Sequence, residues 1–221
     1  MGVCCSTLEK DPSFQRLPYD MSKLTTNPVP FIWMVGASGT GRHLHARTIS
    51  EKFIYELISV SNLLQSEGNQ PTERGRIVHD ALRDSTRKVP DEIVIDLLKE
   101  EILSKVRGSN GFLFNGFPRT AQQASMFVKE IGNVDAIIYL YTDMQVMISR
   151  IREKKSKNLH ENLLKRQIRT YTKEVKKAVS KYGAKIEKVC ADGPPGVVYG
   201  HIEAAINVRL HVRATSIYSR N

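Results

Sequence analysis

A short apolar run followed at once by a glycine-rich turn constrains the fold of this chain more than any other feature. The run Phe31–Val35 reads Phe-Ile-Trp-Met-Val, and such a segment is typical of a strand buried on both faces of a parallel sheet. The turn that follows has three glycines within six residues, and a helical pattern then extends from about Arg42 to Tyr55. This order of strand, turn and helix indicates one unit of a sheet wrapped by helices.

The same alternation continues along the chain. Apolar runs recur at Gly111–Phe114 and Ala136–Tyr141, with a weaker run at Lys185–Cys190. Helical patterns separate these runs at Asp91–Val106, Ala121–Ile131, Met144–Arg152 and Glu161–Tyr182. Strands that alternate with helices predict the α/β class, with a parallel β-sheet surrounded by helices.

The chain is expected to hold one folded domain behind a tether. Its 221 residues suit a single domain with a sizeable core, which we place at residues 31–221. Residues 1–30 contain four prolines and no helical or strand period, so we expect a flexible tether there. No apolar run approaches the roughly 20 residues that a membrane-spanning helix needs.

The glycine-rich turn has the backbone features of a phosphate-binding loop. It keeps every glycine of the pattern G-x-x-x-x-G-K-[S/T] but neither of the last two letters. The loop residues are Gly36, Ala37, Ser38, Gly39, Thr40, Gly41, Arg42 and His43. Glycines let successive backbone N–H groups point at phosphate oxygens, and the following helix adds the positive end of its dipole. The alternative is a glycine-rich turn that carries no ligand.

Arg42 stands where the pattern has lysine. It keeps a positive charge for the phosphates of ATP, but a planar guanidinium is not equivalent to a compact ammonium group. His43 and the following Leu44 offer no hydroxyl group to Mg²⁺. We therefore expect residues 36–44 to bind ATP through the backbone, with altered side-chain contacts.

A second motif gives the chain a specific resemblance. The segment Gly111–Thr120 reads Gly-Phe-Leu-Phe-Asn-Gly-Phe-Pro-Arg-Thr, which resembles the adenylate kinase signature G-F-[LI]-[LI]-D-G-[FY]-P-R-T. The segment Val89–Ile95 is similar to V-P-D-E-[LI]-V-I of the same family. The resemblance extends from about Phe31 to Leu210 and implies a P-loop nucleoside monophosphate kinase fold with a short lid.

This resemblance implies phosphoryl transfer from ATP, carried with Mg²⁺, to AMP or a similar nucleoside monophosphate. The implied catalytic cations are Arg42, Arg119 and Arg166. Arg150 would join the loop in the ATP site and lie against the donor adenine. The implied acceptor site comprises Val89, Gly116, Phe117, Pro118, Arg119 and Gln123. Within it, Arg119 would grip the acceptor phosphate and Gln123 would bond the acceptor base.

Several positions depart from the family pattern. The acceptor motif S-T-G-D-[LM]-L-R reads Ser-Val-Ser-Asn-Leu-Leu-Gln at 59–65, so Val60 replaces a threonine and Gln65 replaces an arginine. Asn115 replaces the aspartate that organises Mg²⁺ in the family. The expected lid, residues 153–158, has lysines but neither arginine nor aspartate, and no cysteine cluster for zinc. The sequence therefore predicts no metal site made of protein side chains.

The sequence leaves two functions open. One is a nucleoside monophosphate kinase with weakened activity, which Arg42, Arg119 and Gln123 support. The other is a catalytically inactive, membrane-anchored nucleotide-binding or scaffolding relative, which Gln65 and Asn115 favour. We expect a monomer in either case.

The net charge of +10 lies within one segment. Residues 150–188 contain 14 Lys or Arg and 4 Asp or Glu, and the rest of the chain is balanced. Such a block suits phosphate ligands, an anionic membrane surface or a solvated helix face. Nucleic acid is not expected, because the block lacks interleaved aromatic residues and any recognition motif. A surface role is the alternative for Arg166, and Tyr171 and Tyr182 are interpreted as packing residues.

The first six residues match the pattern for N-myristoylation, with Gly2 as the acceptor and Ser6 at the required place. One acyl chain gives only marginal membrane binding, so palmitate on Cys4 and Cys5, or the basic segment, would supply a second signal. The alternative is an unmodified tail. Three cysteines, two of them adjacent, indicate a reducing compartment. We expect a cytoplasmic protein that is peripheral at the cytoplasmic face of a membrane.

Overall fold

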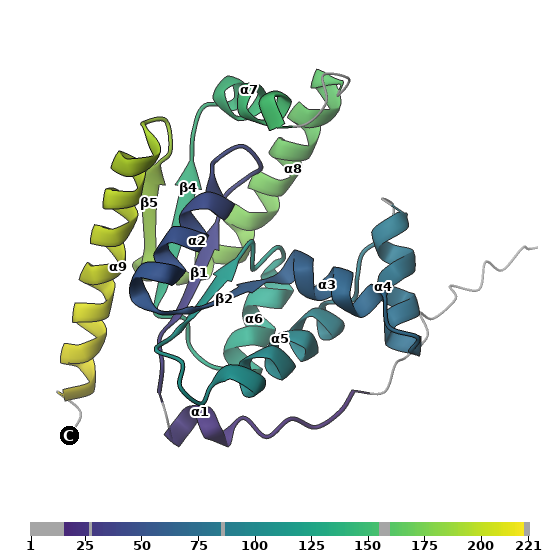
Figure 1. Ribbon diagram of the computed structural model, residues 1–221, viewed down its shortest axis with the longest axis vertical. Coiled ribbons are helices and arrows are strands. Elements are labelled where there is room, and N and C mark those ends of the chain that lie inside the picture. The colour runs from purple at the N-terminus through teal and green to yellow at the C-terminus, as the bar shows by residue number, and fades with distance from the viewer. Residues whose placement is uncertain (1–15, 27, 85–86, 155–159, 219–221) are drawn as a thin grey trace, which may run out of the picture.

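The computed structural model describes residues 16–26, 28–84, 87–154 and 160–218, and Figure 1 shows their arrangement. The strands are β1 (Phe31–Val35), β2 (Glu56–Ser59), β3 (Phe112–Asn115), β4 (Ala136–Tyr141) and β5 (Ile186–Cys190). The helices are α1 (Ser22–Thr26), α2 (Arg42–Phe53), α3 (Val60–Gly68), α4 (Glu73–Arg83), α5 (Asp91–Lys105), α6 (Ala121–Glu130), α7 (Met144–Lys154), α8 (Glu161–Val179) and α9 (Pro195–Tyr218). A 3-10 turn, η1 (Ser180–Lys185), follows α8.

The five strands of the described chain are parallel and lie in the order β2-β3-β1-β4-β5. In the register of the central strand, Met34 pairs with Asn115 of β3 and with Ile138 of β4. The carboxyl ends of these three strands therefore meet beside the turn that follows Val35. In open parallel sheets this edge is where ligands bind.

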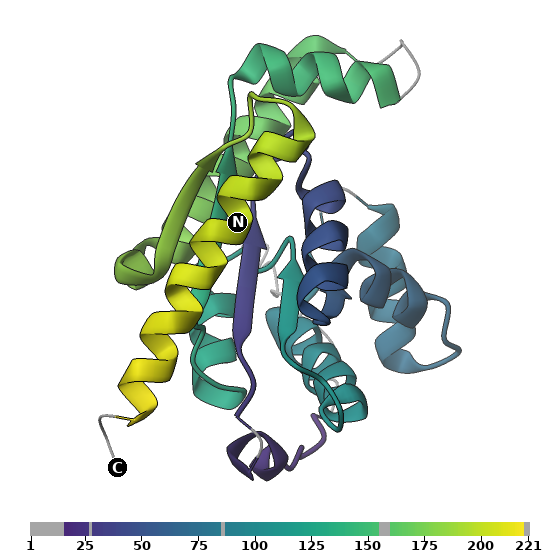
Figure 2. The same ribbon diagram turned by 60° about the vertical axis from the view of Figure 1, so that its left-hand side comes forward.

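Helices cover both faces of the sheet because β1 is apolar on both sides. Phe31, Trp33 and Val35 pack into a core with α5, α6 and α8, whereas Ile32 and Met34 pack with α2 and α9. All five side chains are buried. In both views α9 runs along the sheet, and α3 and α4 project from it as a pair (Figures 1 and 2). The predicted α/β class, with a parallel sheet surrounded by helices, is confirmed.

The apolar patterns predict β1 and β4 with their observed bounds, and β3 and β5 to within one residue. They do not predict β2, α3, α4 or α9. The edge strand β2 has four residues, and Ile58 is the one among them that is buried, so its pattern is weak. Within the described ranges, no helix is long and apolar enough to cross a membrane.

The described part of the N-terminal segment packs against the domain. The Arg16 guanidinium donates to both oxygens of Asp96 on α5, at 2.5 and 3.0 Å, and to Glu130 at the end of α6, at 2.8 Å. The Tyr19 hydroxyl donates to Glu100 of α5. Residues 16–26 and 28–30 thus form a docked arm, unlike the flexible tether that we expected there. Gly2, Cys4 and Cys5 lie outside the described residues.

Candidate active site

The glycine-rich loop connects the carboxyl end of β1 to the N-terminus of α2. Gly39 has a φ of 89°, and a Cβ there would stand 2.5 Å from the Met147 carbonyl oxygen, so no larger residue fits. Gly41 is the N-cap of α2 and supplies no side-chain cap to it. The first N–H groups of α2 have no intrahelical partner, which leaves them available to an anion.

The remaining loop side chains divide into one that closes the loop and several that face solvent. Thr40 is buried, and its hydroxyl donates to the Ala37 carbonyl oxygen at 2.8 Å. Ser38, His43 and Leu44 are exposed. The backbone path is therefore set by glycines and by Thr40, and the exposed side chains do not block the loop from inside.

The Arg42 guanidinium is held over the loop by neutral groups. It donates to the Asn115 amide oxygen at 2.7 Å, to the Tyr171 hydroxyl at 2.8 Å and to the Gly36 carbonyl oxygen. The Tyr171 ring also lies under the guanidinium, with 5.8 Å between the Arg42 carbon and the ring centre. Among the described residues, no carboxylate forms an ion pair with Arg42. Its charge is thus oriented but not neutralised.

Asn115, at the end of β3, completes this network. Its amide nitrogen lies 2.8 Å from Nδ1 of His43. Although the side chain is exposed, the surrounding protein partly desolvates the ring and lowers the pKa of His43, with smaller contributions from the charges of Arg42 and Lys154. The neutral ring, in which Nδ1 can accept, is thereby favoured at pH 7. A Cβ on Gly116, which has a φ of 77°, would stand 2.9 Å from the Arg42 guanidinium. Only glycine at 116 leaves room for Arg42 in this position.

Arg119 supplies a second cation without a counter-ion at the same edge of the sheet. Its guanidinium donates to the Ser61 hydroxyl of α3 at 3.1 Å. Although the side chain is exposed, the surrounding protein desolvates it enough to lower its pKa, and repulsion from Arg42 adds to this while Tyr171 opposes it. A desolvated cation without a carboxylate partner in the described chain is a good site for an anion.

The segment before Arg119 is a buried structural turn. Gly116, Phe117 and Pro118 are all buried. The Phe117 ring lies edge-on to Trp33, with 5.6 Å between ring centres. These three residues therefore hold Arg119 in place through packing.

Both ends of the Gln123 amide are hydrogen-bonded within the protein. Its amide nitrogen donates to Asp91 at 2.8 Å, and its amide oxygen accepts from the backbone N–H of Arg119 at 2.8 Å. The side chain is buried. Val89 is half-buried against the core on the α5–α6 side. In this arrangement Gln123 positions Arg119, and it would have to exchange partners to bond an acceptor base.

Arg150 of α7 lies beside the loop. Its guanidinium donates to the Ala191 carbonyl oxygen at 2.8 Å and approaches the Gly39 carbonyl oxygen at 3.4 Å. It therefore ties the loop to the segment between β5 and α9, next to the predicted ATP phosphates.

The helix α8 presents Tyr171 rather than Arg166 to the loop. Five residues separate them, which turns their side chains roughly 140° apart around the helix. Arg166 is exposed and forms no ion pair with any described residue, and no contact joins it to Arg42 or Arg119 in the described part of the chain. Tyr171 continues the apolar stripe of α8, which is why the sequence suggests packing alone. Tyr171 does pack against the core, and its hydroxyl contact with Arg42 is an additional role; Tyr182 packs against Trp33.

Comparison with known proteins identifies the family. The family model described as adenylate kinase matches residues 34–187. The chain belongs to the adenylate kinase family. It is 29% identical over 177 residues to adenylate kinase isoenzyme 1 of Rattus norvegicus and of Homo sapiens, which covers 77% of this chain and 91% of each relative. Adenylate kinase isoenzyme 5 of Bos taurus is 27% identical over 182 residues, or 80% of this chain and 32% of that protein.

The structure locates the departures of this adenylate kinase family member from the family motifs. Val60 is buried in the core, so its apolar side chain has a packing role at the start of α3. Gln65 is exposed on the same helix. Of the expected lid, Glu153 and Lys154 end α7, and residues 155–159 lie outside the described ranges.

A metal held by protein side chains does not fit this adenylate kinase site. The Asn115 amide is engaged by Arg42 and His43, and Leu44 has no oxygen to offer. Among the described residues, no three His, Cys, Asp or Glu side chains are grouped as metal ligands.

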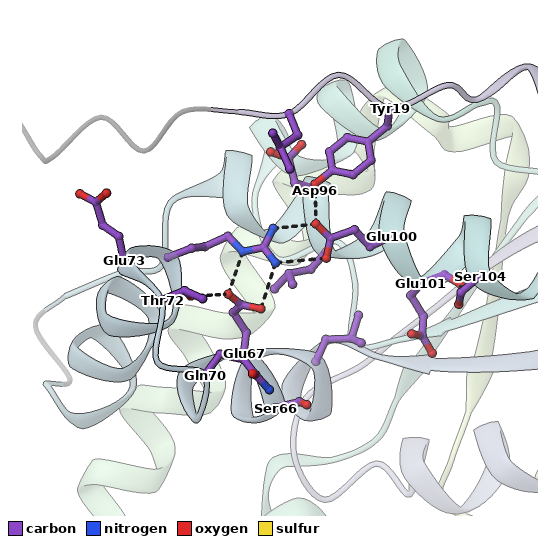
Figure 3. A pocket seen from close by; sticks show the side chains of 14 residues that line it. Tyr19, Ser66, Glu67, Gln70, Thr72, Glu73, Asp96, Glu100, Glu101 and Ser104 are labelled. Atoms are coloured by element: carbon purple, nitrogen blue, oxygen red, sulfur yellow. Dashed lines mark hydrogen bonds and ion pairs between the residues drawn. The ribbon is translucent and has the colours of Figure 1, made fainter.

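A pocket of about 840 Å³ lies away from the loop, between the docked arm and α3, α4 and α5 (Figure 3). Arg74 is one of its lining residues, and the guanidinium bonds Glu67 at 2.8 and 3.0 Å and Glu100 at 2.7 Å. Because its lining is rich in carboxylates and Arg74 is already paired, this pocket does not suit a nucleotide phosphate. The glycine-rich edge of the sheet remains the candidate active site.

Proposed function

We propose that this protein is a nucleoside monophosphate kinase that transfers a phosphoryl group from MgATP to AMP or a similar acceptor, at a reduced rate. The observation that carries the proposal is the pair of cations Arg42 and Arg119. Both face neutral groups at the carboxyl edge of the sheet, beside the uncapped N-terminus of α2. Cations in this state are prepared to bind phosphate oxygens.

Each element of the site has a part in the transfer. The loop backbone and the first turn of α2 would bind the donor phosphates, and Arg42 would neutralise charge that develops on the transferred group. Arg119 would hold the acceptor phosphate in line with it. Phosphoryl transfer requires little covalent chemistry from the protein, so positioning and charge stabilisation account for most of the rate.

Several features support a weakened rate. Gln65 offers no charge where the family has an arginine, Asn115 offers no carboxylate, and Arg166 lies on the outer face of α8. A hydrogen bond to a charged group contributes about 1.5–3 kcal/mol, so three compromised contacts remove roughly 4–8 kcal/mol from the transition state. That loss corresponds to a rate on the order of 10³- to 10⁶-fold lower.

The second candidate is a catalytically inactive nucleotide-binding or scaffolding protein. The observation that favours it is Gln123, whose amide nitrogen is bonded to Asp91 and whose amide oxygen is bonded to the Arg119 backbone. An acceptor base would have to displace these bonds. Under this alternative the loop binds ATP and no transfer follows.

The deciding experiment measures ADP formation by purified protein with MgATP and each nucleoside monophosphate in turn. Arg119→Ala is the test variant, and Arg107→Ala, an exposed arginine between α5 and β3, is the matched control. Turnover that is lost in Arg119→Ala and kept in Arg107→Ala would support the kinase. ATP binding without turnover would favour the second candidate, and absence of both would contradict the two proposals.

We also propose that the protein is held at the cytoplasmic face of a membrane by acylation of Gly2, with Cys4 or Cys5 as a second site. The support is the sequence pattern at residues 1–6. Mass spectrometry of protein from eukaryotic cells tests this directly. A free or acetylated Gly2 would contradict it.

A further inference from the structure

The outer face of α8 and of the η1 turn carries a row of cations. Its members are Arg166, Arg169, Lys173, Lys176, Lys177 and Lys181. All six side chains are exposed. We call this row the α8 stripe.

Helical geometry gathers the stripe on one face. Arg166, Arg169, Lys173 and Lys177 follow one another at intervals of three or four residues, and Lys176 lies next to Lys177, so all five lie on one side of the helix. The buried residues Leu164, Ile168 and Val175 lie on the opposite side and pack into the protein. From Arg166 to Lys177 the stripe runs for about 16 Å along the helix axis. It is therefore a straight, convex and fully solvated row of positive charge.

The protein itself does not neutralise this stripe. Lys165, beside it, is paired with Glu161 at 2.7 Å, and Glu161 also accepts from Arg152 at 2.7 Å. No stripe member forms an ion pair with another described residue. Like charges three or four residues apart destabilise a helix. The stripe thus has an electrostatic cost that the described chain does not compensate.

We propose that the α8 stripe is a docking surface for an anionic membrane. A flat array of lipid headgroups matches a straight row of cations, and each Lys or Arg near such a surface strengthens binding. The stripe contains no aromatic side chain on which a nucleic-acid base could stack. The exposed side chain at the start of α8 is instead the aliphatic Leu163.

The position of the docked arm is consistent with this partner. Arg16 is bound to α5 and α6, and these helices form one layer with α8 on the same face of the sheet. Fifteen residues precede Arg16, and an extended chain spans at most about 3.5 Å per residue, or roughly 50 Å in all. An acyl group at Gly2 can therefore reach a membrane that lies against α8. The inference rests on the proposed membrane association for the identity of its partner, but the stripe acts without the acyl group.

The test uses full-length protein made without acylation, so that its outcome is independent of Gly2. Binding is measured by co-sedimentation with vesicles of phosphatidylcholine alone and of phosphatidylcholine mixed with phosphatidylserine. We expect binding to the anionic vesicles only, and a steady loss of binding as salt is added. Binding to neutral vesicles with the same affinity would overturn the proposal.

A triple variant localises the effect to the stripe. Lys173→Ala/Lys176→Ala/Lys177→Ala should weaken binding to the anionic vesicles on the order of 100-fold. The control Lys52→Ala/Arg83→Ala/Arg107→Ala removes the same charge from exposed positions elsewhere and should change binding less than about threefold. Equal losses in the two variants would show a net-charge effect and overturn the assignment.

Two further measurements separate a loss of membrane binding from a loss of folding. Thermal unfolding of both variants checks that they fold, and the salt titration of the unaltered protein needs no variant. Binding to single-stranded RNA without binding to the anionic vesicles would also overturn the proposal. If acylated protein binds neutral and anionic vesicles equally, while unacylated protein binds neither, acylation stands and the α8 stripe has no membrane role.

Discussion

Arginines in two regions of this molecule are treated in opposite ways. Beside the docked arm, Arg74 bonds Glu67 and Glu100, two of the carboxylates labelled in Figure 3. Arg16 bonds Asp96 and Glu130, so each cation has two carboxylates. At the edge of the sheet, Arg42 is held by an amide, a hydroxyl and a carbonyl group. The first region uses charge to join segments of the fold, whereas the second orients a charge and leaves it for an anion.

The largest expected effect tests the second region. Arg119→Ala should lower kcat/KM for phosphoryl transfer by about 10²- to 10⁴-fold, because two charged hydrogen bonds to a phosphate contribute about 3–6 kcal/mol. Its free energy of unfolding should stay within about 0.5 kcal/mol of the unaltered protein, since no ion pair is lost. Kinetics and urea unfolding on the same variant check both halves. A large decrease in the free energy of unfolding would contradict the distinction between the two regions.

Arg74→Ala should have the opposite profile. It leaves Glu67, which is buried, and Glu100 without their shared cation, and should lower the free energy of unfolding by about 2–3 kcal/mol. Urea unfolding provides the measurement. The control is Arg47→Ala, whose exposed pair with Glu51 should contribute less than about 0.5 kcal/mol. Similar losses in both variants would mean that the buried pairing has no special role.

Tyr171→Phe sharpens the account of Arg42. The change removes one of three acceptors of the guanidinium but keeps the ring, so we expect ATP affinity to change by about fivefold, equivalent to about 1 kcal/mol. Isothermal titration with ATP reports this. Tyr182→Phe removes a tyrosine hydroxyl that bonds the Ala124 carbonyl oxygen in the core, and serves as the control with unchanged affinity.

The smallest effect concerns pH. Burial alone would raise the pKa of Glu100 and of Glu130, but hydrogen bonds from Arg74 and Tyr19 lower that of Glu100, and those from Arg16 and Lys99 lower that of Glu130. A lowered folded-state pKa stabilises the fold above the unfolded value of about 4.5, and this contribution is lost as pH falls through the folded value. The Arg16→Ala variant should therefore have a lower free energy of unfolding than the unaltered protein at pH 7. The difference in free energy between the two proteins should decrease below pH 4.5. A difference in free energy of unfolding that does not change with pH would contradict this linkage.

The sequence predicts the fold and the backbone of the site because both depend on local signals. The run Phe31–Val35 is buried on both faces as its composition requires, and the three glycines of the loop have the positive or extended φ values that the turn needs. The motif at 111–120 likewise locates Arg119 beside the loop. Each of these features depends on residues that are consecutive in the sequence.

The partners of the cations depend on contacts that the sequence does not display. Arg42 and Tyr171 are 129 positions apart, and Arg16 and Asp96 are 80 apart. Helical periodicity places Tyr171 on the apolar face of α8. An apolar pattern does not distinguish a tyrosine whose hydroxyl forms a hydrogen bond from a phenylalanine that only packs. Arg166 is expected in the site from its motif position alone, and its side chain points roughly 140° around the helix from Tyr171.

The clamp at Arg16 has a mechanical consequence. Any pull on residues 1–15 is delivered to Asp96 and Glu130, which lie on two helices of the core layer. Further along the arm, Tyr19 bonds Glu100, and Met21, Leu24 and Val29 pack against the core. A force applied at the N-terminus therefore acts on α5 and α6 before it can reach β1 and the glycine-rich loop.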